Sequence, residues 1–472
     1  MIIRTKIVAT IGPASGEKPM LRRLAEAGCD VFRINFSHGS NEQRESFLRA
    51  IREVEQELGE PLAVMGDLCG PKIRVGPVAG GSVLLGEGQE IVIQREPIEG
   101  SAKRISTTLA ELVDEAVPGE KILINDGAIA LKVDRADPPD ELVCTVTRGG
   151  MLSSGKGVNL PQTELSLSAL TEKDRRDVEW IAGREFDYVA LSFVRKADDI
   201  HRLRSLLGEG GSEARIIAKI EKPQALKNIE EIMQATDGVM VARGDLGVET
   251  YLPAVPVAQK RIARLAQKAC KPCIIATQML ETMTHSQMPT RAEVSDVANA
   301  VLDQTDAVML SGETAVGEYP ARAVGMMNEI VSHVQAYADE TCTHKPVRLE
   351  ELPLASSVAA GVQGILAEQE VAAVCVFTAT GASALALAKA RLQRPILAIS
   401  QHLRTVRRMA MYYGVESRRA DPPEHTRDVL DLFEQFAKDR GIASPGDRLV
   451  VVSGRPIGQH GAANTIVIHT VG

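Results

Sequence analysis

Short runs of apolar, often β-branched residues recur between residues 6 and 312, and they restrict the possible fold more than any other feature of the sequence. Segments with helical patterning separate the runs, which is typical of a parallel sheet covered by helices on both faces. Eight is the number of such strands that closes a (β/α)8 barrel, so the sequence predicts an α/β fold built on a TIM barrel. The eight runs are Lys6–Gly12, Val31–Phe36, Leu62–Leu68, Tyr188–Phe193, Ile216–Glu221, Val239–Gly244, Cys273–Met279 and Ala307–Gly312.

The third and fourth runs are too far apart for one connecting helix. The intervening residues 71–160 contain short alternating stretches joined by turn residues, such as Val83–Gly88 and Ile122–Gly127, and this pattern predicts a separate small β-barrel domain. Because the insertion follows the carboxyl end of a barrel strand, we expect it to fold over the barrel mouth as a lid that excludes water.

A further domain is expected after the barrel, where Pro346 breaks the helical pattern. The strand-like runs Val374–Phe377, Ile396–Ser400 and Leu449–Val452 alternate with helices there, which predicts an open α/β sheet. The predicted domains are residues 1–70 and 161–341 for the barrel, 71–160 for the lid, and 347–472 for the C-terminal domain.

Composition argues against several classes of protein. The chain has 54 basic and 62 acidic side chains, a net charge of −8, and only 3% aromatic residues, so nucleic-acid binding is not expected. No apolar run reaches the roughly 18 residues that cross a membrane, and the first residues lead directly into a strand without a signal-peptide pattern. The seven cysteines lack any framework spacing, and together these features predict a cytoplasmic location without a membrane partner.

Two charged residues at the end of the fifth run suggest chemistry. Side chains alternate along a strand, so Lys219 and Glu221 point to the same side. Asp245 follows the neighbouring run, and strands about 4.8 Å apart would let both carboxylates reach one hard divalent cation. A fixed lysine beside such a metal stabilises negative charge on phosphate or enolate oxygens. The alternative interpretation is a structural ion pair.

Polar side chains stand at the ends of seven of the eight runs, from the second to the eighth. In a TIM barrel the carboxyl ends of the strands build the active site, so this set predicts a catalytic mouth, although any single member could be a cap or turn. The set comprises Arg33, Asn35, Ser37, Asp67, Ser192, Lys219, Glu221, Arg243, Asp245, Thr277, Gln278, Ser311 and Glu313.

Two glycine-containing loops are candidate phosphate sites. Thr378–Ser383 combines hydroxyls with a glycine just before a helix, which predicts an anion site, with ordinary helix capping as the alternative. Gly150–Gly157 nearly matches a P-loop, but Gly157 replaces the required Ser or Thr and no helix follows. A P-loop is therefore rejected, while Lys156 remains a candidate contact for a nucleotide phosphate.

Over essentially its whole length the chain resembles the pyruvate kinase family. The resemblance implies phosphoryl transfer from phosphoenolpyruvate to ADP, which yields ATP and pyruvate in the last step of glycolysis. The stretches that carry it are Lys6–Ser15, Arg33–Gly39, Lys219–Glu221, Ala242–Gly247, Thr277–Glu281, Pro289–Asn299 and Met309–Ala315.

The resemblance also implies roles for individual residues. Glu221 and Asp245 would hold Mg²⁺ (or Mn²⁺), and Lys219 would stabilise the transferring phosphoryl group. Thr277 would pass a proton to the enolate, with Glu313 and Ser311 further along the relay. The other implied substrate contacts are Arg33, Arg74, Ser192 and the backbone N–H groups around Gly244 and Asp245. The implied nucleotide contacts are Asn35, His38, Arg74 and Lys156.

One motif departs from the family pattern at the third strand. The familiar form is Asp-Thr-Lys-Gly-Pro-Glu, whereas this chain has Asp67-Leu-Cys-Gly-Pro-Lys72. The family's monovalent-cation site would consist of Asn35, Ser37, Asp67 and the carbonyl of Leu68. A lysine in place of the glutamate changes the local charge by two units, so we predict that K⁺ is not required; the alternative is that Lys72 faces solvent.

The C-terminal domain departs from the pattern as well. Ala382 stands where some family members carry an arginine, so the identity of any effector is open. We expect Thr378, Thr380 and Ser383 to bind a phosphorylated effector, and we expect a homotetramer.

Two other functions use many of the same residues. A Mg²⁺-dependent lyase acting through an enolate would need the lysine, the carboxylates and the metal, but neither lid nor nucleotide. A binding or regulatory protein descended from the enzyme would be expected to have lost a core group, and none is missing. An assay with phosphoenolpyruvate, with and without ADP, separates the three.

Overall fold

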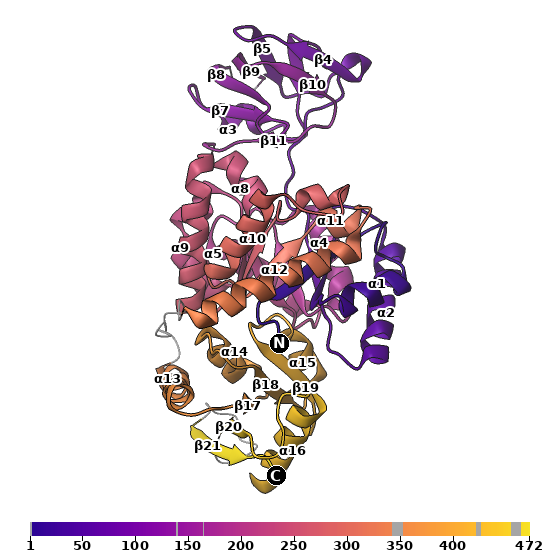
Figure 1. The fold of residues 1–472 in the computed structure, drawn as a ribbon. Helices are drawn as coiled ribbons and strands as arrows, with labels where there is room; N and C mark the ends of the chain where they lie inside the picture. The colour runs from indigo at the N-terminus through magenta and orange to yellow at the C-terminus, as the bar shows by residue number, and fades with distance from the viewer. Residues whose placement is uncertain (1, 138–139, 164, 342–352, 422–425, 455–463) are drawn as a thin grey trace.

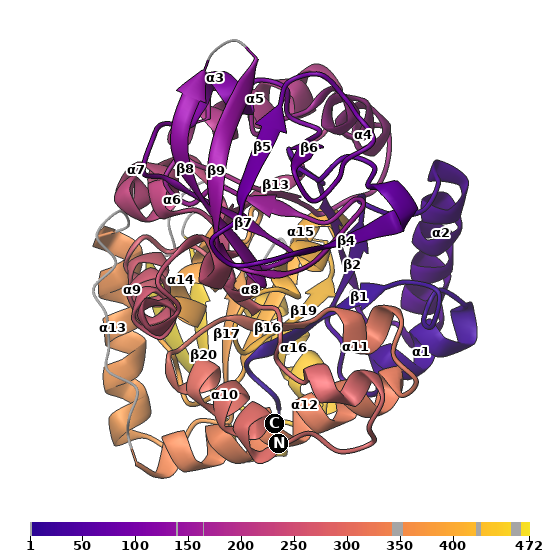
Figure 2. The same cartoon turned by 90° about the horizontal axis from the view of Figure 1, so that it is seen from above.

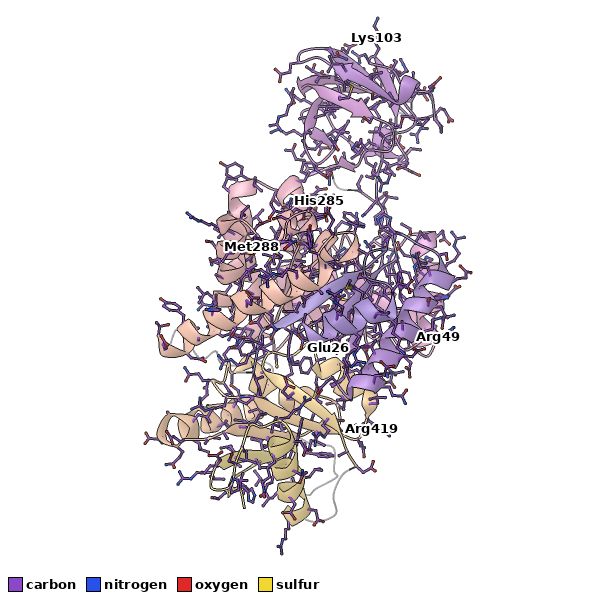
Figure 3. All side chains as sticks on the ribbon, turned by 45° about the vertical axis from the view of Figure 1, so that its right-hand side comes forward. Glu26, Arg49, Lys103, His285, Met288 and Arg419 are labelled. Carbon is purple, nitrogen blue, oxygen red and sulfur yellow. The ribbon has the colours of Figure 1, made fainter. Side chains whose placement is uncertain are left out.

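The computed structural model describes residues 2–137, 140–163, 165–341, 353–421, 426–454 and 464–472. They form three parts arranged along one axis, with the lid at one end, the barrel in the middle and the C-terminal domain at the other end (Figure 1). Lys103 lies at the far tip of the lid, and Arg419 lies on the C-terminal domain across the barrel (Figure 3). The barrel therefore meets a different domain at each of its two ends.

The barrel confirms all eight predicted strands. They pair in parallel and close in the order β1-β16-β15-β14-β13-β12-β3-β2. The strands are β1 Lys6–Ile11, β2 Val31–Asn35, β3 Ala63–Asp67, β12 Tyr188–Leu191, β13 Arg215–Ile220, β14 Gly238–Ala242, β15 Cys273–Ala276 and β16 Ala307–Leu310.

Each of these strands ends slightly earlier than predicted. The last residues of each predicted run lie beyond the end of the strand, and some of them adopt unusual backbone conformations. Thr277 and Gln278 after β15 have φ of 70° and 55°, and Phe193 after β12 has φ of 55°. Positive φ is uncommon for residues other than glycine, and such strain concentrates at functional sites.

Helices surround the barrel, as the alternating pattern predicts. In α2 (Asn41–Leu58) the hydroxyl of Ser40 accepts the N–H of Gln43 at the start, and Gly59 with φ of 67° ends the helix. The other helices are α1 Lys18–Glu26, α4 Glu172–Ala182, α5 Ala197–Glu209, α6 Pro223–Lys227, α7 Ile229–Ala235, α8 Arg243–Glu249, α9 Val255–Lys268, α10 Arg291–Leu302, α11 Gly312–Ala315 and α12 Pro320–Glu340.

The lid is an all-β domain with one small helix. In the described residues its strands form a six-stranded sheet, β11-β7-β8-β9-β5-β6, and a two-stranded sheet, β10-β4, around one apolar core. Seen from above, the lid overlies the side of the barrel that carries α4 to α7 and leaves α10 and α12 uncovered (Figure 2). The elements are β4 Ser82–Leu85, β5 Glu90–Gln94, β6 Arg104–Ser106, α3 Leu112–Glu115, β7 Lys121–Ile124, β8 Ile129–Asp137, β9 Glu141–Arg148, β10 Gly150–Ser153 and β11 Val158–Asn159.

The C-terminal domain is an open sheet in the order β19-β18-β17-β20-β21, in which β21 pairs antiparallel with β20. The three predicted strands are present, and β19 and β21 are additional. The break predicted at Pro346 and the boundary at residue 347 lie outside the described residues. The elements are α13 Pro353–Glu368, β17 Ala373–Phe377, α14 Ala382–Lys389, β18 Ile396–Ser400, α15 Leu403–Met409, β19 Val415–Arg419, α16 Thr426–Asp439, β20 Arg448–Ser453 and β21 Thr465–Thr470.

The foot of the barrel is sealed against the C-terminal domain. Apolar side chains inside the barrel, such as Met240 and Met309, belong to the same buried cluster as Leu387 and Met409 of the C-terminal domain. The buried Tyr188 hydroxyl donates to the Arg408 carbonyl at 2.6 Å across this joint. Within the described part of the chain, no helix combines the length and apolar character needed to span a bilayer.

Candidate active site

Lys219 lies at the centre of the polar mouth. Its Nζ atom is 3.2 Å from Asp67 Oδ1, 3.0 Å from Glu221 Oε1 and 2.7 Å from Ser192 Oγ. Neighbouring strands bring these residues together, because β3 pairs with β12 and β12 pairs with β13. The strand-end pattern therefore correctly predicts that this lysine and these carboxylates share one location.

The charges of this cluster stabilise one another. Burial alone would lower the pKa of Lys219, but Asp67 and Glu221 outweigh it and raise that pKa above its ordinary value. Burial likewise opposes ionisation of Asp67, yet the cations of Lys219 and Arg33 hold the pKa of its carboxyl below the usual range. The lysine is thus a permanent cation at the mouth.

Arg33 extends the cluster toward the adjacent strand. Its Nε atom donates to Asp67 Oδ2 at 2.7 Å, and Nη1 donates to Thr10 Oγ1 at 2.9 Å. Arg33 is only 8% exposed, so these contacts fix the guanidinium in one orientation. A preorganised guanidinium beside a buried ammonium forms an anion-binding pair.

The acidic side of the mouth consists of Glu221 and Asp245. Glu221 is fully buried; its Oε2 atom accepts the N–H of Phe193 at 2.8 Å, and its Oε1 atom is paired with the Lys219 ammonium at 3.0 Å. Burial and, less strongly, the neighbouring Asp245 carboxylate raise the pKa of Glu221 against the effect of Lys219. Two neighbouring carboxylates at the mouth fit a hard divalent cation.

The donor set also narrows the kind of metal. Among the described residues there is no group of three or more His, Cys, Asp or Glu side chains arranged as a metal site. Mg²⁺ is commonly held by one or two carboxylates while water and substrate oxygens complete its shell. Two carboxylates are therefore enough for Mg²⁺, whose other ligands would be water and substrate, but too few for a metal whose ligands must all come from the protein.

Thr277 faces Gly244 across the mouth. Its Oγ1 atom accepts the Gly244 N–H at 2.8 Å and donates to the Ala276 carbonyl at 2.6 Å. The Gly244 N–H, which the family resemblance assigns to the substrate carboxylate, therefore contacts Thr277 in this structure. The adjacent Arg243 donates to the Thr277 carbonyl at 2.8 Å and to Asp296 at 2.7 Å, which anchors the strained turn.

Glu313 lies behind this turn. Its carboxylate accepts the N–H groups of Leu280 at 3.1 Å and Ser311 at 2.7 Å, and burial raises the pKa of the carboxyl. Glu313 is fully buried, so it acts on the mouth only through its neighbours. A buried carboxyl of raised pKa is suited to hold and release a proton.

A cleft of about 310 Å³ separates the lid from the barrel. Lys72, Arg74 and Lys156 line it on the lid side, and Asp245 lines it on the barrel side. Neither Asn35 nor His38 is among the described residues that line this cleft. The structure therefore brings together two of the four residues assigned to the nucleotide.

The residues of the expected monovalent-cation site have other partners. The Asp67 carboxylate is paired with Arg33 and Lys219, and the Leu68 carbonyl accepts the Ser192 hydroxyl at 2.8 Å. The Asn35 side-chain oxygen accepts the Ser37 N–H at 3.0 Å. Lys72 is exposed and faces the cleft, where its charge adds to those of Arg74 and Lys156.

The hydroxyl loop of the C-terminal domain has a local structural role. Thr378 Oγ1 accepts the Gly381 N–H at 3.0 Å, and Thr380 Oγ1 accepts the Ala382 N–H at 3.4 Å. Gly381, with φ of 87°, is the N-cap of α14. Thr378 is buried, whereas Thr380 is exposed and Ser383 is half-buried, so the two outer hydroxyls remain accessible.

Sequence reasoning missed three residues beside the mouth. Lys222 and Glu249 form a salt bridge of 2.5 Å, and Asn159 of the lid donates to the same Glu249 carboxylate at 2.9 Å. The spacing of Glu249 four residues after Asp245 could have placed both on one face of a helix. The contact with Asn159 depends on the position of the lid, which no local pattern encodes.

Comparison with protein families extends these observations over the chain. A family model described as "Pyruvate kinase, barrel domain" matches residues 2–324, and one described as "Pyruvate kinase, alpha/beta domain" matches residues 356–469. The first match includes the lid, because the barrel strands on both sides of the insertion fall within it.

Curated relatives are similar over almost the full length. The pyruvate kinase of Geobacillus stearothermophilus is 39% identical over 471 residues, which is 99% of this chain and 80% of the relative. That of Methylorubrum extorquens is 40% identical, covering 98% of this chain and 97% of the relative. That of Agrobacterium vitis is 43% identical, covering 98% of this chain and 96% of the relative.

Proposed function

The chain belongs to the pyruvate kinase family, and from this premise we propose how its own residues divide the work of the reaction. It is a phosphotransferase whose substrates are phosphoenolpyruvate and ADP and whose products are pyruvate and ATP. The observation that carries the proposal is the buried cluster of Lys219, Asp67 and Glu221 at the barrel mouth.

Lys219 and Arg33 stabilise the phosphoryl group during transfer. A loose phosphoryl transition state spreads negative charge over three oxygens, and fixed cations lower its energy without reorganisation. Both side chains are held by Asp67, which supports this role. The Ser192 hydroxyl donates to the Leu68 carbonyl and accepts a hydrogen bond from the Lys219 ammonium. These two bonds keep the ammonium directed into the mouth.

Glu221 and Asp245 would hold Mg²⁺ or Mn²⁺. The bound metal would supply positive charge at the oxygens of the substrate carboxylate and phosphate. The proximity of the two carboxylates, seen in the effect of the Asp245 charge on the pKa of Glu221, supports this assignment. The N–H of Phe193 keeps the Glu221 carboxylate oriented whether or not a cation is present.

Thr277 passes a proton to the enolate carbon, with Glu313 and Ser311 behind it. A threonine hydroxyl is too weak an acid to act alone, so it relays a proton from water. The strained backbone at Thr277 and the bond from Arg243 to its carbonyl support a fixed position for this hydroxyl. The raised pKa of Glu313 suits a reserve proton at the end of the relay.

Arg74 and Lys156 bind the phosphates of ADP. Both line the cleft between lid and barrel, where a nucleotide would lie next to the transferred phosphoryl group. Asn35 and His38 would complete this site from the barrel rim. Closure of the lid would exclude water and prevent transfer to it.

K⁺ is not required for this reaction. Lys72 supplies a fixed cation in the motif where other family members carry a glutamate, and Arg33 and Lys219 already neutralise Asp67. Turnover measured with tetramethylammonium as the only monovalent cation should change little when KCl is added at constant ionic strength. Activation of a hundredfold, equivalent to ~2.7 kcal/mol, would contradict this. Lys72→Glu should acquire a potassium requirement.

Thr378, Thr380 and Ser383 bind a phosphorylated effector in a homotetramer. The exposed Thr380 and the α14 N-terminus support a phosphate contact, and symmetric assembly would make its effect on the substrate response steep. A panel of sugar phosphates and nucleoside monophosphates should shift the substrate curve and the melting temperature. If neither moves, the hydroxyls serve only to cap α14.

A coupled assay tests the activity itself. Pyruvate should form from phosphoenolpyruvate only when ADP and Mg²⁺ are both present. Release of pyruvate at the same rate without ADP would identify an enolate lyase instead. Glu221→Gln, which retains the shape of the side chain, should abolish turnover if the metal assignment is correct.

A further inference from the structure

A buried carboxylate that the reaction does not use lies next to the two proposed metal ligands. Glu249 is 1% exposed, and its Oε1 atom contacts Lys222 Nζ at 2.5 Å and Asn159 Nδ2 at 2.9 Å. Its Oε2 atom is buried without a hydrogen-bond partner. Asn159, Lys222 and Glu249 all line the cleft between lid and barrel. One carboxylate thus joins two elements of the barrel and one of the lid.

Each contact leads to a different part of the proposed metal site. Lys222 directly follows Glu221 at the end of β13. Glu249 lies one turn after Asp245 on α8, so the position of this helix determines the position of Asp245. Asn159, the last residue of the lid strand β11, lies three residues after Lys156. The salt bridge between Lys222 and Glu249 therefore fixes the separation of the two carboxylates that would share a cation.

Phe193 also contacts this network. Its backbone N–H donates to Glu221 Oε2, and its ring centroid lies 5.8 Å from Lys222 Nζ. The φ of 55° at Phe193 shows that the chain accepts local strain to adopt this arrangement. The Lys222 ammonium therefore has two partners, the Glu249 carboxylate and the Phe193 ring.

We propose that Glu249 is a positioning residue that sets the spacing of Glu221 and Asp245 for the divalent cation. The proposal rests on the metal assignment made above. Groups that orient metal ligands from behind typically change metal affinity about 10–100-fold when they are removed. Glu249 does so through the Lys222 pair on one side and through α8 on the other.

The proposal differs from a simple effect of charge. If Glu249 and Lys222 acted only through their electric fields, removing the anion would weaken cation binding and removing the cation would strengthen it. If the pair acts by positioning, removing either partner weakens cation binding. The sign of the Lys222 effect therefore separates the two explanations.

The experiment titrates Mn²⁺ alone into the full-length protein and follows free Mn²⁺ by electron paramagnetic resonance. Glu249→Gln should weaken binding about tenfold, and Lys222→Gln should also weaken it, by a similar factor. The double variant should bind Mn²⁺ no more weakly than the more affected of the two single variants, because both substitutions break the same interaction. Asn159→Ala should leave Mn²⁺ affinity within about twofold while raising the KM for ADP.

Two further variants make the outcomes decisive. Glu230→Gln is the matched control, because it removes a carboxylate from an exposed pair with Arg261 and should not change Mn²⁺ affinity. If Glu249→Gln does not fold, Glu249→Asp keeps the charge and shortens the side chain, and it too should bind Mn²⁺ more weakly. Tighter binding by Lys222→Gln, or unchanged binding by both Lys222→Gln and the Glu249 variant, overturns the proposal. Failure of the metal assignment is distinct, since Glu221→Gln would then bind Mn²⁺ like the parent.

Discussion

The two ends of the barrel carry nearly the same charged cluster for different purposes. At the mouth, Lys219 and Arg33 share Asp67, which ends β3. At the foot, the buried Lys389 and Arg391 share Asp306, which precedes β16. Residue types and burial are almost identical in the two clusters. The end of the strand at which each one lies decides its role, because chemistry in this fold is confined to the carboxyl ends.

The two clusters differ in the domains from which their partners come. At the foot, both cations come from the C-terminal domain, so the cluster fastens one domain to another, and the Asp306 carboxylate also accepts the Cys273 N–H at 2.8 Å. At the mouth, the cluster lies within the barrel and includes a second carboxylate, that of Glu221, which is paired with Lys219 at 3.0 Å. The mouth cluster therefore joins strands of one domain, whereas the foot cluster joins two domains.

Replacing Lys219 with Met should remove the chemistry of the mouth while leaving phosphoenolpyruvate binding largely intact. The loss of a fixed cation at the transferring phosphoryl group should lower kcat about a thousandfold, ~4 kcal/mol in the barrier, while phosphoenolpyruvate still binds through Arg33 and the metal. Steady-state kinetics and a direct binding titration measure the two effects. A turnover within about tenfold of the parent would contradict the assignment.

Replacing Asp306 with Asn should produce the opposite pattern. It leaves two buried cations uncompensated at the foot, and the free energy of unfolding should fall by about 3 kcal/mol, while kcat below the melting transition changes little. Denaturant titration provides the measurement. If the folded variant loses activity and keeps its stability, the two ends of the barrel are not separated in function.

Lowering the pH should reduce the difference in melting temperature between the parent and Asp306→Asn. Burial opposes the charge of Asp306, but Arg391 and Lys389 hold the pKa of its carboxyl below the unfolded value. A carboxyl with a lowered pKa stabilises the fold above its unfolded pKa, about 4, and that stabilisation is lost as pH falls through the folded pKa. The gap between the two melting temperatures should therefore narrow below about pH 4; a constant gap would show that the pair contributes no net charge stabilisation.

The contact between the barrel and the two chain segments that enter the lid should contribute less to stability than the cluster at the foot. Asp174 at the start of α4 accepts the N–H of Gly70 at 3.2 Å and that of Thr171 at 2.9 Å, so it links both chain segments that enter the lid. Asp174→Ala should lower stability by only about 1 kcal/mol, as expected for a lost cap, but should increase hydrogen exchange at Gly70 and Thr171. Unchanged exchange there would mean that other contacts hold the lid.

Much of the barrel was predictable because its strands are buried on both faces and read as continuous apolar runs. The edge strand β19 was not, since its sequence Val-Glu-Ser-Arg-Arg contains few apolar residues. Strand periodicity also predicted that Lys219 and Glu221 point the same way. The contact between Asn159 and Glu249 was not predictable, because it joins residues 90 positions apart across two domains.

The closure of the barrel has a consequence for synthesis of the chain. β1 is paired on one side by β2 but on the other by β16, and the contact between Thr10 and Leu310 spans 300 residues. At about 5–20 residues per second, a ribosome needs about 15–60 s to supply the second partner. For that time the nascent chain presents an apolar strand with an open hydrogen-bonding edge, a form that associates readily with other chains. Slow translation between β2 and β16 would therefore reduce the yield of protein through aggregation, even when the sequence of the finished chain is unchanged.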